Sequence, residues 1–421
     1  MTSAARQALR QLLMRLGRAN SRRRVLRGAA SLAIAALSGA QARDRGNPAP
    51  LALGVLLPRS GYLTSAGDTC LRGIKLAQHL TRQLALPSCR IVQGDTGETL
   101  ESAVAAAEQL IQRGVAMLIG CYDSGQTVEV AKIAERRRVP FIINIAAAPS
   151  ITAQGYRYVF RNFPDANRIV ADSYSLQKQL FASTGYAPRR AVVLHIDNGR
   201  GIEAIQSMFP QMDMPYDMAP PIPYDPKLTD FSSIVATARA TGADLLWTVS
   251  RMDDAIAITR ELVRQDWTPA ALMSSNAGLH EPQYVHALGP NANGALTFAP
   301  FYDPNKSLTR KLLAAQALLY PDMPLGTLET YSFEAVLIAL DAYSRAHSTD
   351  PQQLAAALRS TDLRNNVSPG PGITFDERGQ NSKLGLIAIQ TLAGVGHVVL
   401  PATAADATPL CPIERWRNRG G

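Results

Sequence analysis

The sequence predicts an α/β protein built from two doubly wound lobes, each a parallel β-sheet between layers of helices. Short, continuous apolar runs alternate with amphipathic helical segments along most of the chain. This alternation is typical of parallel strands that are buried on both faces. The series restarts after residues 160–164, and 421 residues are enough for two domains with separate cores. We therefore expect two lobes rather than one extended sheet.

The first lobe begins with a buried strand that Pro58 and the Ser60-Gly61 turn bring to an end. The segments that follow are short apolar runs, typical of strands, and longer segments with apolar residues at helical spacing. Strands are expected at 51–57, 90–93, 115–119 and 141–143, and helices at 70–84, 98–112 and 127–137.

The second lobe repeats the pattern and is followed by a region of different character. Strands are expected at 191–196, 244–250, 271–274 and 295–302, and helices at 166–183, 231–240, 253–264 and 281–288. A long helix at 328–346 and a shorter one at 350–358, with Pro351 in its first turn, come next. The remaining runs at 372–375, 384–392 and 398–400 predict antiparallel strands with a turn at 376–379.

The first 42 residues have the order of a bacterial export signal. Ser21-Arg22-Arg23-Arg24-Val25-Leu26-Arg27 precedes an apolar run at 28–39, and Ala40-Gln41-Ala42 forms a small-x-small cleavage pattern. The arginine pair resembles the twin-arginine type, whose cargo usually crosses the membrane folded. An amphipathic or anchoring helix is the alternative, but a run of 12 residues is too short to span a bilayer, which needs about 20. We expect a mature periplasmic chain from residue 43 onwards.

The charge of the chain is concentrated in this leader. Residues 1–42 contain eight arginines and no acidic residue, so the formal charge of +9 falls to +1 for the rest. A nearly neutral chain lacks the basic surface that nucleic-acid binding requires. The sequence therefore argues against DNA or RNA as a partner.

The chain contains four cysteines, Cys70, Cys89, Cys121 and Cys411. Their spacings match no zinc motif. An oxidising compartment favours one or two disulfides, and the sequence leaves their connectivity open.

No catalytic motif accounts for the remaining polar residues. Ser124 lies outside a Gly-x-Ser-x-Gly turn, and the chain has neither a dinucleotide-binding nor a Walker glycine motif. His280 and His286 are not at metal-ligand spacing, and Asp253 and Asp254 suit the cap and dipole of a predicted helix. We expect no enzymatic activity, cofactor or metal, with an exported hydrolase as the weaker alternative.

Several short motifs together resemble the periplasmic leucine/isoleucine/valine-binding proteins, which are type I solute-binding proteins of ABC importers. The resemblance runs from about residue 51 to 397. The motifs are Gly54-Val55-Leu56-Leu57-Pro58-x-Ser60-Gly61, Gly67-Asp68, Arg72-Gly73-Ile74, Gly120 to Ser124, the Pro149 loop, Asp197-Asn198-Gly199-Arg200-Gly201 and Phe375-Asp376-Glu377-x-Gly379.

This resemblance implies two lobes joined by three crossovers, expected near Arg161, Pro300 and Pro369. One lobe would comprise 43–161 and 300–368, and the other 162–299 and 369–421. The resemblance also implies a monomer that binds a small solute between its lobes, at the carboxyl ends of the strands, and delivers it to an inner-membrane ABC permease. The alternative is a ligand sensor that regulates a membrane receptor or kinase.

The resemblance also suggests which residues line the solute site. Ser124 matches the serine that receives an amino-acid carboxylate, and Tyr122 stands in the same loop. Alanine, at Ala147 and Ala148, replaces the threonine that helps to hold the ligand, and Asn276 replaces the glutamate that pairs with the ammonium group.

The remaining positions also lack the residues that are usual in the family. Ala66 and Arg251 occupy the positions of aromatic residues, and Asn198 belongs to a shortened Asp-Asn-x-Tyr-Gly motif. An unpaired buried ammonium is costly, whereas an arginine fork suits a carboxylate. Arg251 could instead pair with Asp253 or Asp254. We therefore expect an organic acid, preferably aromatic and without a free α-ammonium, rather than an ordinary amino acid.

Overall fold

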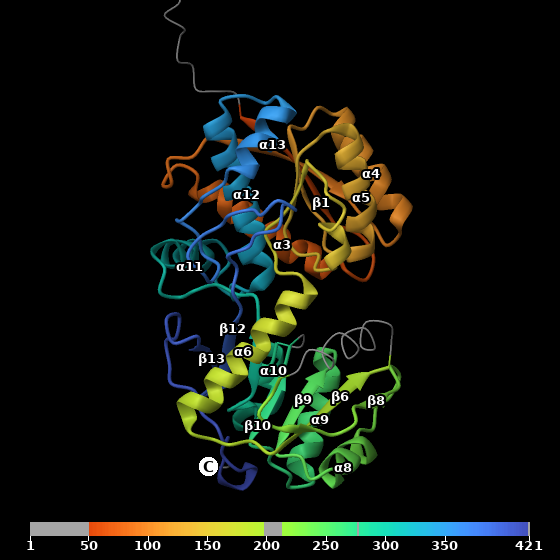
Figure 1. The fold of residues 1–421 in the computed structure, drawn as a ribbon, viewed down its shortest axis with the longest axis vertical. Helices are drawn as coiled ribbons and strands as arrows, with labels where there is room; N and C mark the ends of the chain where they lie inside the picture. The colour runs from red at the N-terminus through yellow and green to blue at the C-terminus, as the bar shows by residue number, and fades with distance from the viewer. Residues whose placement is uncertain (1–49, 198–212, 276–277, 420–421) are drawn as a thin grey trace, which may run out of the picture. The chain divides into compact units, whose positions relative to one another are not determined.

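The computed structural model describes residues 50–197, 213–275 and 278–419 (Figure 1). These residues form two β-sheets with helices on both faces of each. None of the helices in these ranges is both long enough and apolar enough to cross a bilayer. The α/β class and the two doubly wound lobes predicted from the sequence are confirmed.

The first sheet contains five parallel strands in the order β2-β1-β3-β4-β5. The elements are β1 (Leu51–Leu57), α3 (Thr64–Leu80), β2 (Cys89–Asp95), α4 (Leu100–Gln112), β3 (Met117–Gly120), α5 (Ser124–Arg137), β4 (Phe141–Ile143) and β5 (Val159–Arg161). The helices α3, α4 and α5 connect β1, β2, β3 and β4 in turn, so the chain winds in both directions from β1.

Alternation along β1 explains why this sheet carries helices on both faces. Leu53, Val55 and Leu57 enter the core beside α3 and α12 (Thr327–Ala346), whereas Leu56 enters the core beside α4 and α5. These helix pairs lie on opposite sides of β1 in Figure 1. The sheet is therefore buried on both faces, as its continuous apolar strands predict.

The second sheet contains eight strands and is mixed. Its order is β13-β12-β11-β10-β9-β6-β7, with β8 also paired to β6, and β12 and β13 are antiparallel. Its strands are β6 (Arg190–Ile196), β7 (Asp217–Met218), β8 (Ile222–Tyr224), β9 (Leu245–Val249), β10 (Ala271–Ser274), β11 (Leu296–Ala299), β12 (Ile387–Leu392) and β13 (Val395–Leu400).

Two cores cover the faces of the second sheet. One packs the sheet against α6 (Ala166–Thr184), and the other packs it against α8 (Ser232–Ala240), α9 (Met252–Arg264) and α10 (Pro282–Leu288). Trp247 on β9 is the largest side chain of the α6 face and contacts Tyr174 edge-on. Large apolar residues on alternate positions of the same strands thus produce the second doubly wound unit.

The chain passes between the two sheets three times. It leaves the first sheet after β5, returns after β11 to form α11 (Ser307–Leu319), α12 and α13 (Pro351–Arg359), and then runs to β12. The sequence places the last passage near Pro369, and the structure corrects this position. Ile373 and Leu384 still belong to the core of the first sheet, whereas Leu386 belongs to that of the second.

The segment at 372–375 also differs from its prediction. It forms isolated antiparallel bridges with Leu363 and Asn381 instead of the regular antiparallel strand that was predicted. Backbone hydrogen bonds hold the following residues beside the first crossover. The Arg161 N–H donates to Gly379 O at 2.8 Å, and the Asn381 N–H donates to Arg161 O at 2.9 Å. These bonds retain the predicted 376–379 turn beside β5.

The expected disulfides are absent, since all four cysteines carry free thiols. Their positions in the fold explain this correction. Cys70 and Cys121 lie in cores on opposite faces of the first sheet, whereas Cys411 lies in a core of the second sheet. Cys89 packs at the border of the Cys70 core on β2.

Two close backbone contacts require glycine in α3. A Cβ atom at Gly67 would lie 1.8 Å from Pro58 O, and one at Gly73 would lie 2.2 Å from Glu329 O. The first contact lets α3 start at Thr64, earlier than the predicted residue 70, close against the end of β1. The second lets α3 pack closely against α12.

Candidate functional site

Ser124 is the first residue of α5, at the carboxyl end of β3. The helix begins there because the Asp123 carboxylate accepts a hydrogen bond from the Gln126 N–H at 3.0 Å. The half-buried Ser124 Oγ accepts from the Ala148 N–H at 3.3 Å. A hydroxyl that accepts one hydrogen bond still has its own proton to donate. Ser124 is therefore placed to donate to a ligand oxygen at the start of a helix, where negative charge is favoured.

The loop after β4 is fixed through its carbonyl groups. Ala147 O accepts from the Ala166 N–H at 2.9 Å. Ala148 O accepts from Arg161 Nη1 at 2.7 Å and from the Ile151 N–H at 3.2 Å. The structure thus joins Ser124 and Ala148 by a hydrogen bond, and the half-buried Ala147 side chain packs against the core beside α3 and α12.

Ala66 and Tyr122 belong to the same edge of the first sheet. Ala66 lies in the first turn of α3, after β1, and Tyr122 lies in the loop between β3 and α5. Since β1 and β3 are neighbouring parallel strands, their following loops share one edge. Both residues are half-buried, and Tyr122 packs against the core between the sheet and α3.

Arg251 precedes α9 at the carboxyl end of β9, in the second lobe. Its Nε and Nη2 atoms donate to the two oxygens of Asp254 at 2.9 and 3.0 Å, and Nη2 also donates to Pro226 O at 2.6 Å. The Asp254 carboxylate is buried and accepts from Tyr224 OH at 3.2 Å. The structure therefore has the salt bridge that the sequence offers as one alternative, in which the arginine compensates a buried charge.

Two of the predicted site residues, Asn198 and Asn276, lie outside the described residues. Sequence reasoning also missed one residue that the structure brings to the site. Arg161 marks only a chain boundary in the sequence, yet its guanidinium reaches the carbonyl groups of the Ala146–Ala148 loop. The sequence feature that could have identified Arg161 is its position at the end of an apolar strand. A charged side chain is rarely buried there unless it has polar partners.

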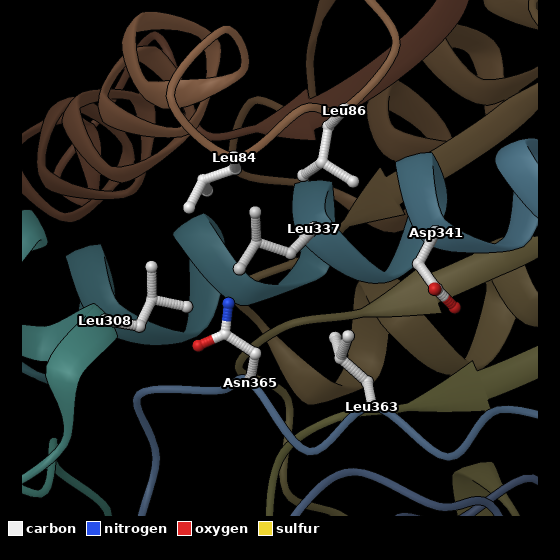
Figure 2. Close-up of a pocket in the computed structure, with 7 residues that line it drawn as sticks. All are labelled: Leu84, Leu86, Leu308, Leu337, Asp341, Leu363 and Asn365. Atoms are coloured by element: carbon white, nitrogen blue, oxygen red, sulfur yellow. The ribbon is translucent and has the colours of Figure 1, made fainter.

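A cavity of about 50 Å³ lies elsewhere in the first lobe (Figure 2). Leu84 and Leu86 on the loop that enters β2 line it together with Leu337 and Asp341 of α12. This is the amino-terminal edge of the sheet, opposite the loop of Ser124. A solute site typically occupies roughly 300–1,000 Å³, so this cavity is too small to hold one.

The described residues contain no group of three or more histidine, cysteine, aspartate or glutamate side chains that could hold a metal ion. What the site offers at the edge of the first sheet is a serine hydroxyl, a helix start and a loop held by its carbonyl groups. Such an arrangement can hold an anion or a polar oxygen.

In two doubly wound α/β lobes, the loops at the carboxyl ends of the strands are where a small ligand binds. The family model for periplasmic binding proteins matches residues 50–388, and the chain belongs to that family. The resemblance to the leucine/isoleucine/valine-binding proteins is confirmed, and membership implies an exported, periplasmic protein.

Curated relatives span nearly the whole chain. The chain is 24% identical over 392 residues to Leu/Ile/Val-binding protein homolog 7 of Brucella abortus, covering 89% of this chain and 96% of the relative. It is 23% identical over 372 residues to homolog 8 of Brucella suis, covering 85% of this chain and 92% of the relative.

Solved structures support the same fold. A putative branched-chain amino acid ABC transporter protein from Silicibacter pomeroyi matches with a TM-score of 0.78 at 15% identity, over 87% of this chain and 100% of that chain. A solute-binding protein from R. palustris in complex with benzoate matches with a TM-score of 0.65 at 19% identity, over 85% and 98% of the two chains.

Proposed function

We propose that this protein is the solute-binding component of an ABC importer and delivers its solute to an inner-membrane permease. The observation that carries the proposal is the family match over residues 50–388, on a chain with two α/β lobes. Curated relatives are named Leu/Ile/Val-binding protein homologs, and a solved structure with the same fold is described as a putative branched-chain amino acid ABC transporter. Permease and ATPase genes beside this gene would support the proposal, whereas a sensor-kinase gene in their place would contradict it.

We further propose that the solute is an organic acid, preferably aromatic, without a free α-ammonium group. Ser124, at the start of α5, supplies a donor for the carboxylate. Ala66, Ala147 and Ala148 are small residues where the family has larger or polar ones, which leaves room for a ring. The benzoate complex of a protein with the same fold is consistent with such a ligand.

A calorimetric titration of residues 43–421 tests the ligand class. The panel comprises benzoate, benzamide, leucine, valine and a short aliphatic acid. We expect benzoate to bind at least about tenfold more tightly than leucine, because a buried ammonium without a partner is destabilising. Tight binding of leucine or valine would overturn the acid proposal and leave the importer proposal intact. Binding of none of these or of a wider solute library would count against both.

Arg251 is proposed to face the carboxylate from the second lobe. Because Arg251 also pairs with Asp254, its test needs a variant in which both residues are changed. Arg251→Ala alone leaves the buried Asp254 without its cation, so the matched variant is Arg251→Ala with Asp254→Asn. We expect benzoate affinity to fall about fivefold in both variants, the loss of a partly exposed charge-assisted contact. Thermal denaturation separates this loss from the destabilisation expected of the single variant. Unchanged benzoate affinity in both removes Arg251 from the site.

A further inference from the structure

We propose that Arg161 is a positioning residue that holds the Ala146–Ala148 loop and places a buried positive charge behind it, favouring anionic solutes. This inference rests on the proposed solute-binding function. It adds the residue that sets the charge preference of the site.

All three nitrogens of the Arg161 guanidinium donate hydrogen bonds, although the side chain has no solvent exposure. Nη1 donates to Ala148 O at 2.7 Å and to Ala146 O at 3.4 Å. Nε donates to Gln380 Oε1 at 2.6 Å, and Nη2 donates to Thr152 Oγ1 at 3.0 Å. A fork of this shape fixes the direction of the loop carbonyls in a way that a lysine ammonium cannot.

All four of these acceptors are neutral, so the hydrogen bonds leave the positive charge only partly compensated. Among the described residues, the salt-bridge partner of Arg161 is Asp165, at 3.6 Å. That carboxylate also caps α6 by accepting from the Arg168 N–H at 2.8 Å. Burial lowers the pKa of Arg161 to about 10, which leaves the guanidinium charged at neutral pH. A cation in a low-dielectric interior acts over a longer range than one in water.

One residue of the loop, Ala148, links Arg161 to Ser124. The carbonyls of Ala146 and Ala148 point to the guanidinium, whereas the Ala148 N–H donates to Ser124 Oγ at 3.3 Å. The Ala147 carbonyl accepts from the first N–H of α6, that of Ala166. Ala148 therefore contacts both side chains: its carbonyl is held by the Arg161 guanidinium, and its N–H polarises the Ser124 hydroxyl, which strengthens the serine as a donor to an anion.

The position of Arg161 in the chain also links the solute loop to the crossovers. Arg161 ends β5, where the chain leaves the first sheet, and Gln380 belongs to the segment that leads back to the second sheet. Gln380 Nε2 donates in turn to Phe163 O at 2.8 Å. A substitution at Arg161 therefore removes contacts to the loop and to two of the three passages between the lobes.

The test separates charge from structure by comparing benzoate with benzamide, its neutral analogue of the same shape. Arg161→Met removes the charge at similar length, Arg161→Lys keeps it without the fork, and Arg168→Met, on an exposed arginine of α6, is the control. We expect Arg161→Met to weaken benzoate binding at least tenfold more than benzamide binding. Arg161→Lys should retain most of the preference for benzoate, and Arg168→Met should change neither affinity.

Equal loss of both affinities in Arg161→Met would show a structural role alone and overturn the inference, as would unchanged binding of benzoate. If Arg161→Met fails to fold, Arg161→Gln and Arg161→Lys provide the comparison, with circular dichroism as the check of folding. Wild-type protein that binds neither compound defeats the aromatic-acid proposal, and the charge inference falls with it. Wild-type protein that prefers benzoate, with the preference unchanged in the Arg161 variants, defeats this inference alone.

Discussion

Replacing Glu334 with glutamine should lower the free energy of unfolding by about 2–4 kcal/mol, the range for hydrogen bonds to a buried charged group. Glu334 lies in α12 and has no solvent exposure. Its Oε1 accepts from the N–H groups of Val367 and Ser368 at 2.8 and 2.7 Å, and its Oε2 accepts from Asn162 Nδ2 at 2.8 Å. One carboxylate therefore joins α12 to the first crossover and to the segment that leads back to the second sheet.

Glutamine has nearly the same shape but places an NH₂ group against a donor in either orientation. One orientation opposes the two backbone N–H groups, and the other opposes Asn162 Nδ2. Asn162 cannot turn over to help, since its Oδ1 already accepts from Asn381 Nδ2 at 2.8 Å. In either orientation the glutamine NH₂ group faces another donor with no acceptor between them. These unsatisfied buried donors destabilise the variant.

Denaturant unfolding of the two proteins measures this effect. Glu377→Gln, in the exposed turn after Phe375, is the matched control and should change the unfolding free energy by less than about 0.5 kcal/mol. Equal stability of Glu334→Gln and wild type would mean that the glutamate is not the acceptor that joins these segments.

Lysine at both Arg22 and Arg23 is expected to leave the precursor in the cytoplasm almost completely. A twin-arginine receptor reads the arginine pair, and the substitution keeps the charge while removing the planar fork. Fractionation followed by immunoblotting measures the periplasmic share. Lysine at Arg6 and Arg10, outside the Ser-Arg-Arg core, is the control and should leave export unchanged. Normal periplasmic yield from the Arg22 and Arg23 variant would exclude the twin-arginine route but not export by the general pathway.

The sequence predicted most of the framework because the strands of both sheets are continuous apolar runs. The predicted strand at 141–143 has the bounds of β4, and the predicted helix at 328–346 begins one residue after α12 does. Elements without a strong pattern were missed. β5 is only three residues long and β7 two. The passage near Pro369 was misplaced because backbone bonds to Arg161 hold the following turn beside the first sheet.

The candidate site was predictable to a smaller extent. The resemblance indicated Ser124 and the alanine loop, which the structure joins by a hydrogen bond. For Arg251, spacing alone allowed either a ligand contact or a bridge to a nearby acid, and the bridge to Asp254 depends on burial that a sequence does not display. Arg161 was not predicted as part of the site, since its Gln380 partner is 219 residues away in the chain.

The four unpaired thiols bear on when this protein must fold. Burial raises the pKa of Cys70, Cys121 and Cys411 to about 12 and that of Cys89 to about 11. The reactive thiolate is therefore scarce in the folded chain. An unfolded chain has no such protection, and oxidants outside the cytoplasm could couple its cysteines into pairs that the fold does not contain. A route that exports the protein already folded would deliver these thiols shielded, and folding before transport would then protect the chain from oxidative misfolding.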